Sequence, residues 1–198
     1  MQKLVFTNSR GQSVELTNSA PFVLQKIGGT GNVDTDIQTS KAPYQDGETL
    51  HDALLSKRVI TIEATAAGAD IADMYSKRQL LCSVFNPKLG QGVLTYQNDH
   101  TTKQIKAICE DLVDFKDRKG NNQAFDVTLI CSEPFWLDTA ITERTMQYQM
   151  GGLMFPLKLP SKFSETTYKR VLTNNGDVET PVEIEFYGPA INPTVRYN

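Results

Sequence analysis

The chain has 198 residues, of which 39% are hydrophobic and 22% charged, and its formal net charge at pH 7 is −3. These values are typical of a folded globular protein and argue against a charge-rich disordered chain. The mildly acidic balance disfavours tight binding to a nucleic-acid backbone, which depends on clustered Lys and Arg. The sequence has no apolar run of about 18 residues that could span a membrane, and its first ten residues lack the apolar core of a signal peptide.

The cysteines and histidines form no pattern that would bind a metal ion. Cys82, Cys109 and Cys131 are far apart and lie in apolar segments, so we expect three buried thiols rather than disulfides or zinc ligands. His51 and His100 lie in polar, turn-like stretches without other ligands at a suitable spacing. We therefore expect no metal, no cofactor, and folding in a cytoplasm.

The N-terminal part of the chain predicts short strands. Leu4–Phe6 and Val14–Leu16 flank an Asn/Gly turn and predict a hairpin, and Phe22–Ile27 predicts a third strand. The glycine cluster at 28–32 has the composition of a phosphate-binding loop, but such a loop leads directly into a helix. Here alternating, β-branched residues follow the cluster, so we expect a glycine turn instead.

A polar excursion follows this turn. Residues 33–39 predict a strand, and residues 39–48 are largely polar. Excursions of this size within a compact domain usually have a function. Val33, Ile37 and Tyr44 have too few apolar neighbours to form a core of their own. Two interpretations remain open: a surface hairpin, or an arm that packs on a neighbouring subunit, with these three residues as the candidate subunit interface.

The middle of the chain predicts a strand, a helix and a further strand. Residues 57–65 alternate as in a half-buried strand. Asp70 is the predicted N-cap of the helix. Apolar residues at three- and four-residue spacing predict one stripe that packs on a sheet: Ile71, Met74, Tyr75, Leu81, Cys82 and Phe85. We expect the helix to end at Asn86-Pro87 and the next strand to cover residues 93–96.

The remaining residues predict more strands and a second domain. Residues 103–113 and 123–132, separated by a charged turn at 116–122, predict an antiparallel hairpin. Beyond Trp136 the pattern changes register, and the chain stops within a strand-like pattern. We therefore expect one domain over residues 1–137, followed by a linker and the incomplete start of a second β domain over residues 138–198.

No catalytic constellation is visible, and we expect no enzyme. Glu110 and Asp111 would point to opposite faces of a strand, so we interpret the cluster with Asp114 as solvated charges rather than as a general acid–base pair. No serine has a G-x-S-x-G context. Phe135-Trp136 fits either an aromatic plug at the end of a barrel or an exposed stacking platform.

The order of these features resembles that of a known family. The motifs that carry the resemblance are Gln45-Asp46-Gly47, Arg58-Val59-Ile60-Thr61, the helix with Arg78 and Leu81, Asn86-Pro87, Gly92-Val93-Leu94-Thr95-Tyr96, Cys131-Ser132-Glu133-Pro134-Phe135-Trp136, Phe155-Pro156-Leu157, Asn175-Gly176-Asp177, Pro181, Gly188 and Asn192-Pro193. Over almost the whole chain, this pattern resembles the distal tail proteins of siphophages, the phages with long non-contractile tails.

The resemblance implies a fold, a function and partners. The fold would be mainly β: an N-terminal β-sandwich or split barrel flanked by one α-helix, similar to tail-tube proteins, followed by the start of a galectin-like β-sandwich. Six copies would form a ring that caps the tail tube, connects it to the tail tip or baseplate, and lets DNA pass through its lumen. The partners would be further copies, the tail tube protein, a tail-tip protein and a receptor-binding protein, with no specific nucleic-acid binding and no membrane. The protein would be part of the virion, assembled in the host bacterial cytoplasm.

Two hypotheses from other classes stay open. A carbohydrate-binding β-sandwich module for host attachment is suggested by the β-rich pattern and by Phe135-Trp136. A cell-wall hydrolase has only the carboxylates between Glu110 and Asp114 in its favour.

Overall fold

The structure is a computed structural model and describes residues 2–140, 143–145, 148–151, 164–167, 171–185, 187 and 194–195. The chain divides into two compact units, Met1–Ile141 and Thr142–Asn198. Within the described residues, no helix is both long enough and apolar enough to cross a membrane.

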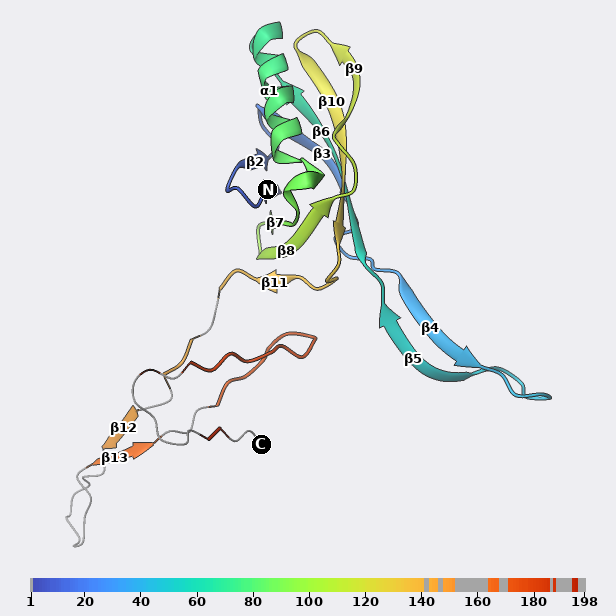
Figure 1. Cartoon of the computed structure of the whole chain (residues 1–198), viewed down its shortest axis with the longest axis vertical. Helices are drawn as coiled ribbons and strands as arrows, with labels where there is room; N and C mark the ends of the chain where they lie inside the picture. Colours follow the sequence, from blue (N-terminus) through green and yellow to red (C-terminus); the bar gives the residue numbers. More distant parts are fainter. Residues whose placement is uncertain are drawn as a thin grey trace, which may run out of the picture. The chain divides into compact units, whose positions relative to one another are not determined.

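The first unit is mainly β, as the sequence predicts, with one α-helix in its described part (Figure 1). Its elements are β1 (Lys3–Thr7), β2 (Ser13–Leu16), β3 (Phe22–Gly28), β4 (Thr35–Ser40), β5 (Thr49–Leu55), β6 (Arg58–Ala67), α1 (Ile71–Val84), the 3₁₀ turn η1 (Pro87–Leu89), β7 (Gly92–Gln97), β8 (Thr102–Cys109), β9 (Asp114–Lys119), β10 (Asn122–Cys131) and β11 (Leu137–Asp138).

The strands form two half-sheets that join at both ends, which is the arrangement of a split barrel. The strand order is β2-β1-β7-β8-β10-β6-β3. The half-sheets meet where β8 and β10 pair through Cys109↔Leu129 and Ile108↔Ile130. At the other end, a parallel bridge between Thr17 and Val23 links the residue after β2 to β3. The predicted sandwich or split barrel is therefore confirmed.

Strict alternation in β6 and β10 builds the core. In both strands every second side chain is buried, and the two pair in register over ten residues. The buried apolar residues on these two strands are Ile60, Ile62, Ala64, Ala66, Phe125, Val127, Leu129 and Cys131, and Arg58 and Gln123 are the buried polar ones. Each large apolar side chain removed from water contributes about 1.5–3 kcal/mol, so these two strands form the stable centre of the unit.

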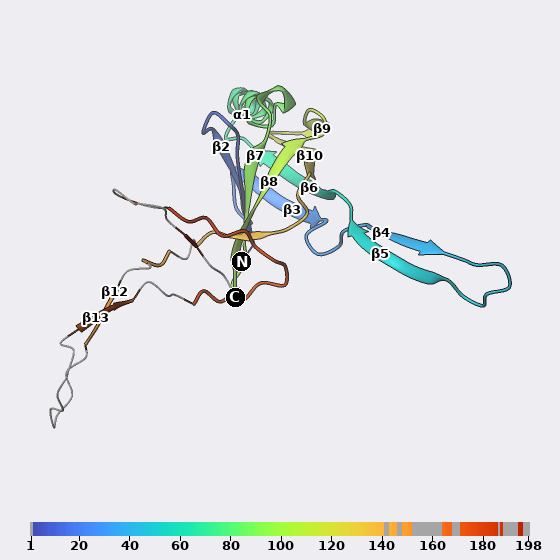
Figure 2. The same cartoon turned by 60° about the horizontal axis from the view of Figure 1, so that its bottom comes forward.

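Helix α1 packs on the barrel through fewer residues than its sequence predicts. Met74, Leu81 and Val84 are buried, and the Phe85 ring stacks on Phe6 with 5.0 Å between ring centroids. The prediction of one continuous stripe is wrong for Ile71, Tyr75 and Cys82, which are exposed. The apolar residues of α1 cover more of its circumference than the barrel can bury. Figure 2 shows α1 nearly end-on.

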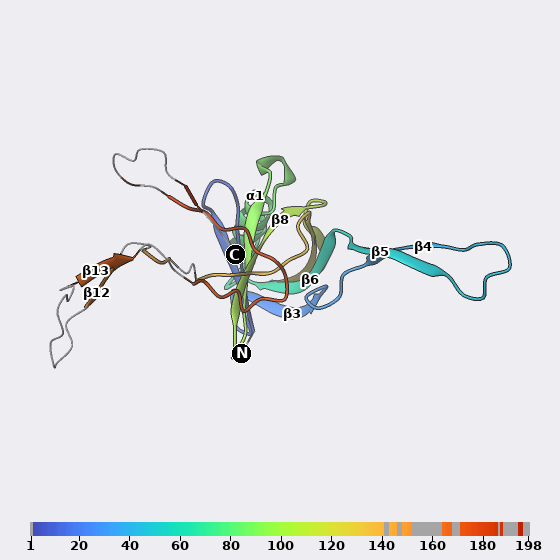
Figure 3. The ribbon, with the colours of Figure 1, turned by 90° about the horizontal axis from the view of Figure 1, so that it is seen from below.

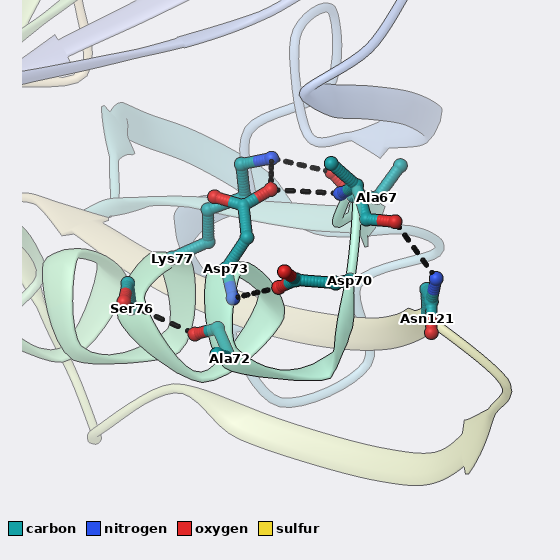
Figure 4. Close-up of polar contacts among 8 residues, drawn as sticks. Ala67, Asp70, Ala72, Asp73, Ser76, Lys77 and Asn121 are labelled. Carbon is teal, nitrogen blue, oxygen red and sulfur yellow. Dashed lines mark hydrogen bonds and ion pairs between the residues drawn. The ribbon is translucent and has the colours of Figure 1, made fainter.

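The first turn of α1 is held by the predicted N-cap and by a second acid (Figure 4). The Asp73 backbone N–H donates to the Asp70 carboxylate at 2.7 Å. The Asp73 carboxylate accepts from the Ala69 backbone N–H at 2.8 Å and from Lys77 Nζ at 2.6 Å. The bond to Asp70 satisfies one of the amides that a helix start leaves without a partner, and the Asp73 carboxylate ties the residue before the cap to Lys77 in the next turn.

Two strand predictions need correction. The predicted strand over 103–113 ends at Cys109, and most of the predicted charged turn over 116–122 belongs to strand β9. The predicted hairpin partner of β10 is therefore split between β8 and β9. Charged residues can form β9 because this strand lies at an edge, where most of its side chains remain in water.

The second unit contains β12 (Tyr148–Gly151), which pairs antiparallel with β13 (Ser164–Thr167). The motifs Phe155-Pro156-Leu157 and Asn192-Pro193 lie outside the described residues. The galectin-like nature of this unit and the domain boundary after residue 137 stay predictions.

Candidate functional site

A hairpin of β4 and β5 extends from the barrel as an arm. We use the name arm for residues 34–56, whose base is closed by a hydrogen bond of 2.8 Å from the Ser56 backbone N–H to the Asp34 carbonyl. Both strands are exposed along their whole length, and all three ribbon views show them reaching away from the barrel strands (Figures 1, 2 and 3). Among the described strands, β4 and β5 pair only with each other, and isolated two-stranded hairpins are at best marginally stable in water.

The strand register gives the arm one apolar face. Ile37 lies opposite Ala53, Thr35 opposite Leu55, and Thr39 opposite Leu50. Residues opposite each other share a face, and alternate residues along a strand share it too. Ile37, Leu50, Ala53 and Leu55 therefore gather on one side, which we call the apolar face. The opposite side carries Asp36, Gln38, Ser40, Thr49, Asp52 and Leu54.

A bulge in β5 completes the apolar face. The pairing shifts register between Gln38 and Thr39, so that His51 has no direct partner in β4. Simple alternation from Ala53 would place Leu50 on the polar side. The extra residue moves Leu50 to the apolar side instead, because a bulge reverses the facing of the residues beyond it. The His51 ring is bonded to Ser40 Oγ at 2.6 Å.

The apolar face is open to solvent. Ile37 is 60% exposed, Leu50 63% and Leu55 48%. Single exposed apolar side chains are common, but several on one face of a protruding element mark an interaction surface. Leu50 and Leu55 are residues that the sequence prediction missed, since β5 was not predicted. The sequence signal for them is the apolar content of residues 50–55. Leu50 and Leu55 fall on one face only when the bulge is included, so strict alternation does not reveal it.

Two of the three predicted interface residues lie in the arm and the third lies just before it. Val33 is half-buried just before the base of the arm, Ile37 lies on the apolar face of β4, and Tyr44 lies in the loop at the tip. The structure does not bring them together. Tyr44 is fully exposed and has a φ of 65°. A bulky residue in the left-handed region is uncommon and often marks a functional position.

At the root of the arm, the glycine cluster contains the predicted position of positive φ, at Gly29, and is followed by a strand as predicted. It makes the chain cross unusually close to β6, which was not predicted. Gly29 has a φ of 78°, and a Cβ atom there would lie 1.9 Å from the Val59 carbonyl oxygen. Only glycine allows this approach of the chain to β6.

Arg58, the first residue of β6, binds this crossing with its guanidinium group. Nε donates to the Pro134 carbonyl at 2.8 Å, and Nη1 donates to the carbonyls of Gly29 at 2.8 Å and Thr30 at 2.9 Å. The side chain is nearly buried, with 7% of its surface exposed. Burial lowers the pKa of Arg58 from its usual value, while the nearby Cys131 acts in the opposite direction.

Trp136 completes the same cluster. Its indole Nε1 donates to the Thr30 carbonyl at 3.1 Å, and its ring lies 5.9 Å from the Arg58 guanidinium carbon and 6.1 Å from the Tyr96 ring. Trp136 packs partly buried against the core, whereas Phe135 remains 41% exposed. One part of Trp136 therefore packs against the core, as the plug interpretation expects. Another part lines a shallow pocket of about 250 Å³, together with Tyr96 and Lys103.

The carboxylates between Glu110 and Asp114 do not form a shared site. Glu110 and Asp111 follow the end of β8, so the expectation that a strand separates their side chains is wrong. Asp114 pairs with Lys116, which also contacts Asp126 at 2.9 Å; these two carboxylates raise the pKa of Lys116. Within the part of the chain that the structure describes, no three His, Cys, Asp or Glu side chains form a metal-binding group.

Two of the three cysteines are buried as predicted. Burial raises the pKa of the Cys109 thiol to about 12 and that of Cys131 to about 11. The prediction is wrong for Cys82, which is exposed on α1, because it belongs to the part of the apolar stripe that the barrel does not cover.

Comparison with known proteins gives a consistent result. The sequence profile of the phage tail protein RIFT-related domain matches residues 9–131. The structure is similar to that of the Dit (gp 19.1) protein of phage SPP1, described as a paradigm of the hub adsorption apparatus in phages that infect Gram-positive bacteria. The TM-score is 0.55 and the identity 13%, covering 77% of this chain and 59% of that one.

Structures of the phage p2 baseplate in its activated conformation are similar as well. With Sr the TM-score is 0.54 and the identity 12%, and with Ca they are 0.52 and 13%. Each covers 86% of this chain and 60% of the other. The chain therefore spans less than two thirds of the length of these relatives. No curated protein matches the sequence.

Proposed function

This chain belongs to the phage tail protein family that carries the RIFT-related domain, and from that premise we propose that it is a distal tail protein whose copies form a closed ring. The resemblance to distal tail proteins in the sequence is confirmed by the family match and by the fold. The protein is thus a structural component of a phage tail. The ring, its size and its contacts are the proposal.

The observation that carries the proposal is the amphipathic arm. Its apolar face, with Ile37, Leu50 and Leu55, is exposed in the single chain. A second copy is the partner we propose, because a head-to-tail contact between identical chains closes into a ring and covers the arm of every copy. Val33, Ile37 and Tyr44 remain the proposed interface, and Leu50 and Leu55 extend it.

The proposed ring would occupy the end of the phage tail tube. Six copies would cap the tail tube, and the tail-tip or tail-associated protein and the receptor-binding protein would assemble on the ring. DNA would pass through its lumen, and the net charge of −3 suits a channel that must not hold DNA tightly. The related structures are named as a hub and as baseplates, which supports this role. We propose no enzymatic activity, no cofactor, and assembly in the host cytoplasm.

A pair of leucines on opposite faces of the arm tests the ring. Leu50→Asp places a carboxylate on the apolar face, where burial without a partner is costly. Leu54→Asp makes the same change in the same strand on the polar face. We expect Leu50→Asp to weaken assembly more than about tenfold, which corresponds to about 1.4 kcal/mol, and Leu54→Asp to assemble like the wild type.

Light scattering coupled to size-exclusion chromatography measures the mass of each variant, and negative-stain microscopy shows whether rings form. A wild-type chain that stays monomeric at high concentration, without rings, would contradict the proposal. Equal assembly of the two aspartate variants would show that the apolar face is not the contact.

Carbohydrate binding is the second candidate, because the pocket beside Trp136 combines two aromatic rings with the Lys103 cation. A glycan array with Tyr96→Ala as the comparison tests it. Absence of a signal that depends on Tyr96 would remove this candidate. For the hydrolase hypothesis, zymography on peptidoglycan without clearing would remove it.

A further inference from the structure

We infer that Arg58 is a positioning residue: with Trp136 it holds the root of the arm in a cage of backbone carbonyls, and this fixes where the arm can reach. The cage consists of Arg58, Trp136 and the carbonyls of Gly29, Thr30 and Pro134. The positioning of the arm root is argued from the structure alone. Its effect on assembly rests on the proposed ring.

Among the described residues, the strands of the arm bury no side chain against the barrel. Every residue of β4 and β5 is exposed, so no side chain of either strand is buried in the barrel core. The two connections to the barrel are the stretch between Gly28 and Thr35 and the short link between Leu55 and Arg58. The direction of the arm must therefore be set in these connections, and both of them end at the cage.

The guanidinium group binds the incoming connection in a way that few residues can replace. Nη1 donates to Gly29 and Thr30 and lies 3.4 Å from the Asn32 carbonyl, while Nε donates to Pro134 on a different segment. No carboxylate pairs with Arg58 among the described residues. A planar group with several fixed donors can serve carbonyls from two segments together, whereas a lysine offers only a point charge.

Glycine and tryptophan give the cage its shape. Gly29 lets the connection pass directly over Val59, which delivers its carbonyl to Arg58. Trp136 donates to the next carbonyl, that of Thr30, which also accepts from Arg58. Pro134 and Trp136 belong to the segment that follows β10 and precedes β11. The cage therefore ties the arm to the segment through which the chain leaves the barrel.

The Arg58 side chain is not needed for the pairing of β6 with β10. Arg58 is the end residue of β6, where it pairs with Cys131, and the β6–β10 ladder continues from there through nine further pairs that do not involve its side chain. Removal of the guanidinium should therefore increase the mobility of the arm root and lower the unfolding free energy of the barrel only slightly.

Distance measurement in the full-length chain tests the position of the arm directly. Spin labels on the exposed Cys82 and on Asp46→Cys at the arm tip report the distance between α1 and the tip, while Cys109 and Cys131 are buried. We expect one narrow distance distribution in the wild-type background. Arg58→Met and Arg58→Lys should widen it clearly. Trp136→Phe, which keeps an aromatic ring but removes the bond to Thr30, should widen it less.

Ile62→Val, a core change on the same strand, controls for loss of stability. Its thermal unfolding should be measured beside that of the Arg58 variants, and its distance distribution should stay narrow. Because Trp136 is the single tryptophan of the chain, its fluorescence reports on the cage, and we expect the emission to change in both Arg58 variants but not in Ile62→Val. In assembly assays, the Arg58 variants should need at least about tenfold more protein.

The outcomes separate the two proposals. A distribution as narrow in Arg58→Lys and Trp136→Phe as in the wild type would overturn the positioning role, even if Arg58→Met fails to fold. Equal widening in Ile62→Val would also overturn it. A wild-type chain that never assembles would contradict the ring alone, since the distance measurement does not depend on assembly.

Discussion

Asp73 shows how a single carboxylate sets the pH dependence of one element. Hydrogen bonds from Lys77 and from the Ala69 backbone N–H hold its pKa below the usual value. A carboxylate with a lowered pKa in the folded state stabilises the fold above its unfolded pKa of about 3.9, and this stabilisation is lost as the pH falls through the lower, folded value. The helix start should therefore weaken in acid.

We predict that Asp73→Asn lowers the unfolding temperature at pH 7 and that the difference from the wild type shrinks below pH 4. The asparagine keeps the size of the side chain but removes its charge. Thermal unfolding by circular dichroism across this pH range measures the difference. Asp117→Asn, on the exposed edge strand β9, is the control. If the difference in unfolding temperature between Asp73→Asn and the wild type stayed constant down to about pH 2, the role of the carboxylate would be refuted.

At the scale of elements, the crossing of the arm root over β6 depends on one glycine. We predict that Gly29→Ala costs about 2–4 kcal/mol of unfolding free energy, because a side chain is strained at positive φ and would overlap the Val59 carbonyl. Gly31→Ala is the matched control, since a Cβ atom there meets nothing within 4 Å, and its effect should stay below about 1 kcal/mol. Urea unfolding compares the two. Similar effects would mean that the crossing is not tight.

Elements with a clear local signal could be predicted from the sequence. Strands β6 and β10 alternate strictly because one face is buried along their whole length, and the cap of α1 follows from side-chain chemistry next to the helix start. Strand β9 could not be predicted from its six residues, five of which are charged. It forms because β10 offers an unpaired edge, which is a property of the assembled sheet rather than of the segment.

The candidate site could be predicted only in part for the same reason. The excursion and two of its exposed apolar residues, Ile37 and Tyr44, were visible as apolar positions without a core. The apolar face was not, because it depends on the bulge at His51 and on pairing between strands. Arg58 is an ordinary strand residue in the sequence. Its role arises from carbonyls of Gly29 and Pro134, which lie 29 and 76 residues away.

At the scale of the molecule, the buried core and the proposed contact between copies lie in different parts of the first unit. The buried residues of the first unit belong to the barrel and α1, and the arm contributes none of them. Loss of the arm should therefore leave folding intact while removing the proposed contact. The cage lies between these parts, and it retains most of its partners without the arm strands because Gly29, Thr30, Arg58 and Pro134 are outside them.

Replacement of Thr35–Leu55 by Asn-Gly tests this division. The two residues would join Asp34 to Ser56, which are already hydrogen-bonded, through a tight turn that Asn-Gly favours. We predict an unfolding temperature within a few degrees of the wild type and unchanged Trp136 fluorescence, but a monomer at concentrations where the full chain forms rings. Calorimetry and light scattering measure the two properties. A shortened chain that still forms the same ring would place the contact between copies on the barrel, and a chain that no longer folds would show that the arm is part of the folding unit.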